Sequence, residues 1–228
     1  MTDFGAVLFD WRGTLVTTLG YEDWVRTALR QLGRDDHTVV VRRIMAAIVG
    51  AAGEPNRLDP PGLDCDAVFH RDTYHRVFAD AGLDPALSEA LYSVESDATH
   101  NPFAVDAVPV LRGIAEHGLP IGVVSDIHFD LRPAFAAAGI ADVVSAFVLS
   151  YEHGVQKPDP AIFRRAADEI GVPPERTLMV GDRHGYDGGA VEVGMTTLLL
   201  PPLRDVRAER LHLAARLLGV PVGKSCAT

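Results

Sequence analysis

The sequence predicts an α/β fold, with a Rossmann-like parallel sheet carrying helices on both faces and an inserted all-helical segment. Short apolar runs recur along the chain, and each is followed by a turn and a helical pattern. Continuous apolar strands between helices are typical of a parallel sheet that is covered on both faces. Residues 18–100 differ, because their apolar residues recur at helical spacing and no strand is evident.

The predicted strands are five apolar runs, most of which end at a polar turn. They are AVLF (6–9), PIGVV (120–124), AFVLS (146–150), TLMV (177–180) and TTLLL (196–200). In open parallel sheets, ligands bind beyond the carboxyl ends of the strands. We therefore expect Asp10, Ser125 with Asp126, and Gly181 with Asp182 to converge in one cleft.

The helices of the core are predicted between and after these strands. The apolar face before the second strand consists of Val105, Val108, Leu111 and Ala115. Asp159 followed by Pro160 is typical of a helix start, and Gly171 is typical of a helix end. Leu211–Leu218 predicts a C-terminal helix, and the tail from Gly219 is expected to be loose.

Residues 18–100 are expected to form a helical domain inserted between the first strand and the rest of the sheet. Its apolar stripes are Trp24, Val25, Ala28, Leu29 and Leu32; Val41, Ile44, Met45, Ile48 and Val49; and Val68, Phe69, Val77, Phe78 and Ala81. Asp84 followed by Pro85 predicts the start of a fourth helix. The predicted core domain then comprises residues 1–17 and 101–228.

The composition is that of an ordinary globular protein, with 228 residues of which 47% are hydrophobic and 23% charged. The formal net charge of −10 argues against nucleic acid or an anionic membrane as the main partner. No apolar stretch is long enough to span a bilayer, and the N-terminus lacks a signal-peptide pattern, so we expect a cytoplasmic protein. Cys65 and Cys226 have no metal-type spacing and are expected to be free thiols.

Four short motifs follow the predicted strand ends. They are DWRGT with Asp10, VVSDIH with Ser125, QKPDP with Lys157, and VGDRHGYD with Asp182 and Asp187. Taken in this order, they resemble the four motifs of the haloacid dehalogenase-like (HAD) superfamily, and the resemblance covers most of the predicted core. Residues 18–100 resemble the helical C1 cap of that family. The resemblance implies a hydrolase, with a small phosphorylated metabolite as the expected substrate.

The resemblance also implies roles for individual residues. Asp10 matches the nucleophile, and a carboxylate at a strand end can attack phosphorus to form an aspartyl phosphate. Lys157 and Ser125 complete the expected catalytic set, since they can neutralise and hydrogen-bond the phosphoryl group. The expected substrate-binding residues are Arg12, Thr14, Ser125, Asp126 and His128. The implied cofactor is Mg²⁺, which prefers hard oxygen ligands, here Asp10, Asp182, Asp187 and the backbone carbonyl of Arg12.

Arg12 departs from the pattern of the family, which has an aspartate two residues after the nucleophile. In the family this aspartate is the general acid/base. Arginine stays protonated and cannot shuttle that proton, and the loss of such help costs about 10² to 10⁴ in rate. His128 and His184 could replace it, although we expect both to be loop histidines that face water. Arg12 could instead bind an anionic part of the substrate.

Two other activities remain open at this point. The dehalogenases of the family also lack the second aspartate, but their metal-free site has no acidic pair like Asp182 and Asp187. Alternatively, the protein could be catalytically weak and bind a phospho-ligand or a protein partner, with Arg12 forming a salt bridge to Asp10 or Asp182. A phosphonoacetaldehyde hydrolase needs a lysine from the cap, and residues 18–100 contain none.

The substrate itself is expected to be selected by the helical segment. The candidates there are Arg26, Arg30, Arg42, Arg43, Arg71, Arg76, His70 and His75. Most of them are expected to lie on solvated helix faces. The sequence leaves the substrate and the oligomeric state open.

Overall fold

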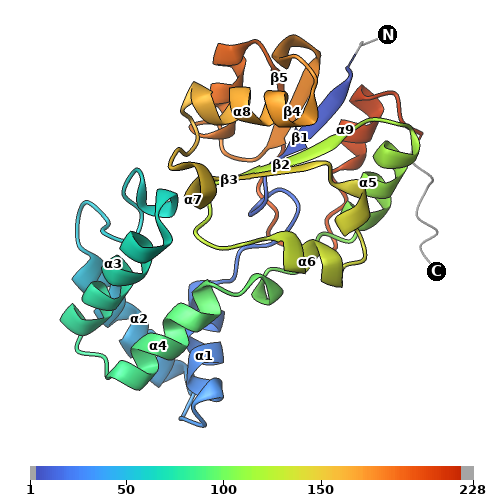
Figure 1. Cartoon of the computed structure of the whole chain (residues 1–228). Helices are drawn as coiled ribbons and strands as arrows, with labels where there is room; N and C mark the ends of the chain where they lie inside the picture. Colours follow the sequence, from blue (N-terminus) through green and yellow to red (C-terminus); the bar gives the residue numbers. More distant parts are fainter. Residues whose placement is uncertain (1–3, 222–228) are drawn as a thin grey trace, which may run out of the picture.

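A computed structural model describes residues 4–221 and contains a five-stranded parallel sheet. The strands are β1 (Ala6–Phe9), β2 (Ile121–Ser125), β3 (Ala146–Leu149), β4 (Thr177–Gly181) and β5 (Thr196–Leu199). Their order across the sheet is β3-β2-β1-β4-β5, so that β1 lies in the centre between β2 and β4 (Figure 1). The predicted Rossmann-like sheet is therefore confirmed, with strand ends shifted by at most one residue.

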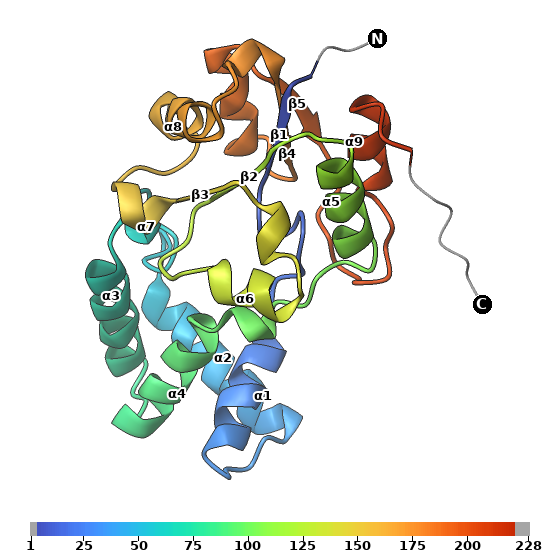
Figure 2. The same cartoon turned by 45° about the vertical axis from the view of Figure 1, so that its right-hand side comes forward.

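Helices cover both faces of this sheet (Figures 1 and 2). One face carries α5 (Ala107–Glu116), α6 (Arg132–Ala137) and α9 (His212–Leu217), and the other carries α8 (Pro160–Ile170). Side chains alternate along β1, with Val7 and Phe9 in the first apolar cluster and Leu8 in the second. The shorter elements are α7 (Ser150–His153), η1 (Leu63–Cys65), η2 (Ala98–His100), η3 (Ala141–Val143), η4 (Pro174–Arg176) and η5 (Asp187–Val193).

Four further helices lie between β1 and β2 in the chain and form a separate bundle to one side of the sheet (Figure 1). They are α1 (Tyr21–Gln31), α2 (Thr38–Ala52), α3 (Ala67–Asp80) and α4 (Pro85–Glu95). Their buried side chains form an apolar cluster of their own, which includes Trp24, Val41, Phe78 and Leu91. The helices expected in this segment are thus present, and α4 begins as predicted, with the Asp84 carboxylate accepting hydrogen bonds from the backbone N–H groups of Ala86 and Leu87.

Some of the predicted apolar faces are wrong. Val68 and Phe69 of α3 are 70% and 47% exposed, whereas Val77 and Phe78 are buried. Nine residues separate each pair, which is two and a half helical turns, so the two pairs point in opposite directions. In α2, Val49 is exposed, so the buried stripe of this helix is narrower than expected.

The predicted face of α5 is also wrong in part. Val105 precedes the helix and is exposed, and the buried residues of α5 are Ala107, Val110, Leu111 and Ile114. The predicted helix from Asp159 is confirmed, since the Asp159 carboxylate caps α8 and Gly171 ends it. The C-terminal helix is confirmed, one residue shorter at each end than expected.

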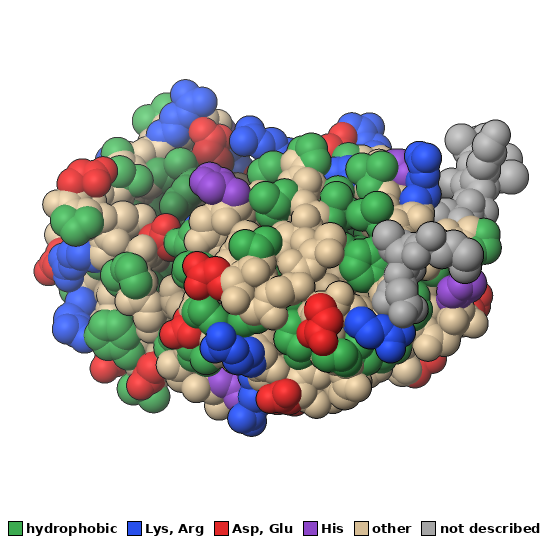
Figure 3. Space-filling view, turned by 90° about the horizontal axis from the view of Figure 1, so that it is seen from above, with side chains coloured by type: hydrophobic (Ala, Val, Ile, Leu, Met, Phe, Trp, Pro, Cys, Tyr) green, Lys and Arg blue, Asp and Glu red, His purple; other side chains and the backbone are tan. Residues whose placement is uncertain are grey.

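The described surface shows no single dominant charge on the face seen in Figure 3, where acidic and basic side chains are interspersed. Within residues 4–221, no helix has both the length and the apolar character needed to cross a membrane. Cys65 is a free thiol, as expected, while Cys226 and most of the predicted loose tail lie outside the described residues.

Candidate active site

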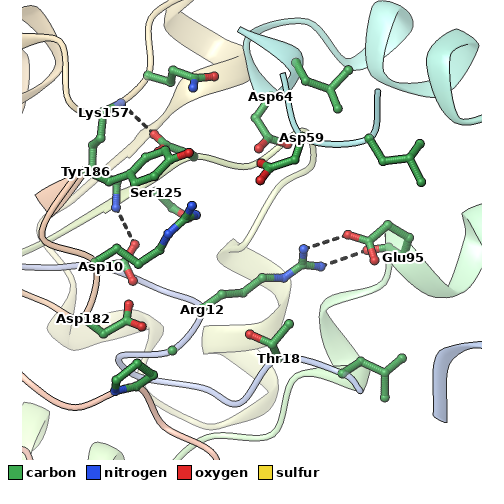
Figure 4. A pocket seen from close by; sticks show the side chains of 18 of the residues that line it. Asp10, Arg12, Thr18, Asp59, Asp64, Glu95, Ser125, Lys157, Asp182 and Tyr186 are labelled. Carbon is green, nitrogen blue, oxygen red and sulfur yellow. Dashed lines mark hydrogen bonds and ion pairs between the residues drawn. The ribbon is translucent and has the colours of Figure 1, made fainter. Parts of the chain in front are cut away.

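A cavity of about 620 Å³ lies where the carboxyl ends of the strands meet the inserted helices. The core contributes Asp10, Ser125, Asp126, Lys157 and Asp182 to its lining. The inserted segment contributes several residues that sequence reasoning did not single out for the site, namely Trp24, Asp59, Asp64, Tyr74 and Glu95. The predicted convergence of the strand ends in one cleft is therefore seen (Figure 4).

Lys157 lies between two buried carboxylates at the base of this cavity. Its Nζ atom donates to Asp10 Oδ1 at 2.5 Å and to Asp187 Oδ1 at 2.7 Å. Burial alone would lower the pKa of Lys157, but the charges of Asp10 and Asp187 raise it above its ordinary value. Burial raises the pKa of Asp10 to about 7, against the opposing effect of Lys157. The lysine therefore stays protonated as the central cation of an acidic cluster.

Asp182 lies beside Asp10, because β4 pairs with β1 and both residues directly follow their strands. Ligand oxygens of Asp10, Asp182 and Asp187 all lie within 4.8 Å of one another. Burial and the nearby Asp187 charge raise the pKa of Asp182. Gly13 permits this approach, since a Cβ atom at that position would overlap the Asp182 carboxylate.

Asp187 is fully buried and has both oxygens engaged in hydrogen bonds. Oδ1 accepts from Lys157, and Oδ2 accepts from the backbone N–H groups of Asp182 and Arg183 at 3.0 and 2.9 Å. The carboxylate thus holds the lysine and the turn after β4 in one arrangement. A direct metal–ligand role, which the sequence motif suggested, would use the remaining lone pair of Oδ1.

The expected substrate-binding residues Thr14, Ser125 and Asp126 take different positions. The buried Thr14 hydroxyl donates to Asp10 Oδ2 at 3.0 Å, so it holds the carboxylate and does not face the cavity. Ser125 is buried at the end of β2 and lines the cavity. Asp126 also lines it, and its Oδ1 accepts from the backbone N–H of Lys157 at 2.8 Å, which ties two motif loops together.

Arg12 reaches away from the acidic cluster toward the inserted helices (Figure 4). Its Nη1 donates to Glu95 Oε1 at 2.7 Å, and its Nη2 donates to the backbone carbonyl of Glu95 at 3.0 Å. The guanidinium also lies 5.7 Å from the centre of the Phe129 ring. The hypothesis that Arg12 forms a salt bridge to Asp10 or Asp182 is therefore wrong for this structure, because its long side chain extends past both to the end of α4.

His128 is buried, and the expectation that it faces water is wrong. Its ring stacks on His70 at 3.4 Å between centroids, its Nε2 lies 2.9 Å from Ser96 Oγ, and its Nδ1 lies 3.4 Å from Asp64 Oδ1. Residues of the inserted segment therefore cover His128 and shield it from solvent. Within the described chain His128 is not among the residues that line the cavity, and His184 is exposed as expected.

The candidate residues of the inserted segment contribute little to the cavity. Among the described residues, none of Arg26, Arg30, Arg42, Arg43, Arg71 and Arg76 lines it. Several of these arginines pair with carboxylates on the surface, for example Arg30 with Asp36 and Arg71 with Glu89. His70 does line the cavity, and His75 does not.

Comparison with known proteins places these features in a family. The model of the haloacid dehalogenase-like hydrolases matches residues 4–191. A glyceraldehyde 3-phosphate phosphatase of Methanopyrus kandleri is 38% identical over 95 residues, which cover 41% of each chain. A phosphoserine phosphatase of Thermus thermophilus is 29% identical over 161 residues, covering 68% of this chain and 57% of the relative. The chain thus spans about half the length of these two curated relatives.

Solved structures share the fold over nearly the whole chain. A HAD phosphatase from Thermococcus onnurineus superimposes with a TM-score of 0.63 and 24% identity, covering 96% of this chain and 100% of the other. A 2-haloacid dehalogenase from Pseudomonas syringae pv. Tomato superimposes with a TM-score of 0.64 and 19% identity, covering 95% and 98%. With the family model matching most of its length, the chain belongs to the haloacid dehalogenase-like hydrolases.

Proposed function

We propose that this hydrolase is a Mg²⁺-dependent phosphatase that removes the phosphoryl group of a small phosphorylated metabolite by transferring it to Asp10. The observation that carries the proposal is the buried Lys157, whose ammonium group joins Asp10 to Asp187 beside Asp182. The names of the two relatives, both phosphatases of small phosphate esters, support the same reaction class. We also propose that residues 18–100 act as a cap over the cavity.

The chemistry follows from the positions of the core residues. A carboxylate oxygen of Asp10 attacks phosphorus, the bond to the leaving oxygen breaks, and an aspartyl phosphate forms. Water then attacks that phosphorus, inorganic phosphate leaves, and the carboxylate is regenerated. Lys157 neutralises the negative charge that gathers at the phosphoryl oxygens, and the Ser125 hydroxyl donates a hydrogen bond to them. Thr14 holds Asp10 in place by its 3.0 Å hydrogen bond.

The acidic cluster fits a magnesium ion. Its donors are hard carboxylate oxygens within 4.8 Å of one another, and Gly13 leaves room for Asp182 beside the nucleophile. Asp10, Asp182 and the backbone carbonyl of Arg12 would hold the ion, while Asp187 positions Lys157 and the turn after β4. The bound ion supplies positive charge that offsets the repulsion between the carboxylates and a phosphate dianion.

The leaving group needs a proton from a source other than Arg12. The guanidinium stays protonated, because the Glu95 charge raises its pKa above its ordinary value even though burial lowers it. His128 is buried outside the cavity lining, and His184 is exposed. We therefore propose that solvent water supplies this proton, with the rate penalty of about 10² to 10⁴ that accompanies the loss of general acid/base help.

A substrate screen on the purified chain tests the proposal. Phosphate esters, acyl phosphates and 2-haloacids are offered with Mg²⁺ and with EDTA, and release of phosphate or halide is measured. We expect phosphate release that requires Mg²⁺ and is abolished by Asp10→Asn, with the melting temperature close to that of the wild type. Turnover that survives Asp10→Asn would exclude the covalent mechanism. Halide release in EDTA would instead show a dehalogenase, and no release from any compound would contradict the phosphatase proposal.

A further inference from the structure

The guanidinium of Arg12 is already occupied by a carboxylate of the same chain. That carboxylate belongs to Glu95. Arg12 and Glu95 both line the cavity, and their side chains are 26% and 20% exposed. Arg12 Nη1 donates to the Glu95 carboxylate at 2.7 Å, and Arg12 Nη2 donates to the backbone carbonyl of Glu95 at 3.0 Å. Glu95 therefore sits where an anionic group of a substrate would otherwise bind Arg12.

From this we infer that Glu95 is a specificity-determining residue, an internal anion that occupies Arg12 and excludes phosphate esters whose leaving group carries a negative charge. The inference rests on the proposed phosphatase activity and names the substrate class for it. A neutral leaving group, such as a polyol or an aldehyde, has no charge that competes with Glu95 for Arg12. A carboxylate on the leaving group must displace Glu95 or remain without a cation.

The inserted segment places further negative charge along the cavity, which supports the same inference. Asp59 and Asp64 line the cavity from the inserted segment (Figure 4). Asp64 contacts His70 and His128, and burial lowers the pKa of His70 to about 3, so that ring adds no positive charge near neutral pH. An anionic leaving group would therefore meet carboxylates on the wall formed by the inserted segment.

The remaining arginines of the cavity belong to the core loops. Arg183 directly follows Asp182, and its guanidinium lies 3.6 Å from the centre of the Tyr186 ring. Arg204 follows β5 and is exposed. Both come from the loops on the side of Asp182, where the phosphoryl group is bound in the proposed reaction. They do not replace Arg12 at the end of α4.

Displacing Glu95 is costly for two reasons. The Arg12–Glu95 pair is partly desolvated, so its charge-assisted hydrogen bonds are stronger than those of an exposed pair. A displaced Glu95 would also share the cavity with the incoming carboxylate, and like charges at close range disfavour binding. We expect the penalty to appear mainly in KM, because it opposes binding of the anionic substrate.

A matched pair of substrates measures the effect. Glycerol 3-phosphate and 3-phosphoglycerate have leaving groups of the same skeleton, and a carboxylate in the second replaces a hydroxymethyl group in the first. For the wild type we expect kcat/KM to be at least about tenfold higher for glycerol 3-phosphate. In Glu95→Gln this ratio should fall at least about fivefold, through a lower KM for 3-phosphoglycerate.

Two further variants separate specificity from folding. Glu89→Gln is the matched control, since Glu89 lies on the same helix and pairs with Arg71 outside the cavity, and it should keep the ratio of the wild type. In Arg12→Gln/Glu95→Gln the gain with 3-phosphoglycerate should disappear, because no cation is left to bind the carboxylate. Glu95→Ala repeats the test in case Glu95→Gln does not fold.

The outcomes distinguish this inference from the proposed function. Release of phosphate from both substrates at equal rates by the wild type, or a preference for 3-phosphoglycerate, would overturn the role of Glu95 and leave the phosphatase proposal intact. An unchanged ratio in folded Glu95→Gln and Glu95→Ala would overturn it as well. If no phosphate ester of the screen is hydrolysed, the phosphatase proposal itself fails.

Discussion

By the motif resemblance, Arg12 stands where an aspartate is expected to protonate the leaving group, and in the structure its guanidinium binds Glu95. Replacement of Arg12 alone by aspartate would remove the cation that pairs with Glu95 and leave two carboxylates near each other. The informative variant is therefore the double one, Arg12→Asp with Glu95→Gln. It restores a carboxyl group at the general acid position and removes the repulsion.

The double variant should gain activity only where a proton is needed. We expect at least about a tenfold rise in kcat with an alkyl ester such as glycerol phosphate, which is within the range for general acid/base help. With p-nitrophenyl phosphate, whose leaving group departs as a stable anion, the rise should be much smaller. Equal gains with both esters would mean that the substitution acts on binding or folding instead of proton transfer.

His70 makes the stability of the protein depend on pH. Burial, together with the nearby His128, lowers its pKa in the folded state to about 3, against about 6.5 for a histidine in an unfolded chain. Between these values the unfolded chain binds a proton that the folded chain does not, so stability falls as the pH drops below about 6.5. For this residue the loss is about 2 kcal/mol from about pH 7 to about pH 5.

Urea unfolding of the wild type and of His70→Phe at the two pH values measures this loss. We expect the variant to lose less stability than the wild type over this interval, by about 2 kcal/mol. His117→Phe, which changes an exposed histidine, serves as the control and should behave like the wild type. The same pH dependence in His70→Phe and the wild type would show that other groups cause it.

At the scale of elements, the site is built by the ends of neighbouring strands. β1, β2 and β4 are adjacent in the sheet, and Asp10, Ser125 and Asp182 lie at or directly after their carboxyl ends. The loop between α7 and α8 adds Lys157, and Asp126 fixes that loop by accepting from the lysine backbone N–H. The close approach of the loops after β1 and β4 depends on Gly13, which has a φ of +84° and lies against Asp182.

Gly13→Ala should weaken magnesium activation. The added Cβ atom would overlap the Asp182 carboxylate, so Asp182 or the turn must move away from Asp10. We expect the Mg²⁺ concentration for half-maximal activity to rise at least about tenfold, which is the loss typical of a disturbed metal environment. Titration of activity with Mg²⁺ measures it.

Gly33→Ala is the matched control for this prediction. Gly33 also has a positive φ, of +63°, but a Cβ atom there would meet nothing within 4 Å. The strain of a positive φ should therefore lower the free energy of unfolding of Gly33→Ala by about 1 kcal/mol. Its Mg²⁺ dependence should not change. A similar Mg²⁺ shift in both variants would show that backbone strain, and not the position of Asp182, is responsible.

At the scale of the whole molecule, the core was largely predictable from the sequence. Asp10, Ser125 and Asp182 each follow an apolar run, and parallel strands bring such residues to one edge of the sheet. The helical nature of residues 18–100 was predictable from the spacing of their apolar residues, because that spacing reports the local period. The face of α3 was not, because Val68 and Phe69 are apolar but lie opposite the buried stripe.

The contacts between the core and the inserted helices could not be predicted. Arg12 and Glu95 are 83 residues apart, and no local pattern links them. Their contact depends on where the inserted helices lie relative to the sheet, and the apolar spacing within either segment does not report that position. The burial of His128 has the same origin, because residues of the inserted segment, among them His70 and Ser96, cover it.

The central place of β1 also bears on how the chain folds during synthesis. β1 pairs with β2 on one side and with β4 on the other, and Asp10 precedes its partner Lys157 by 147 residues. A ribosome adds about 5–20 residues per second, so Asp10 is made roughly seven to thirty seconds before Lys157. Both edges of β1 lack a partner strand until β2 is made, and the edge that pairs with β4 stays open until Gly181 is made. The strand that precedes Asp10 is thus open to pairing with other chains for most of the time that the chain is being made.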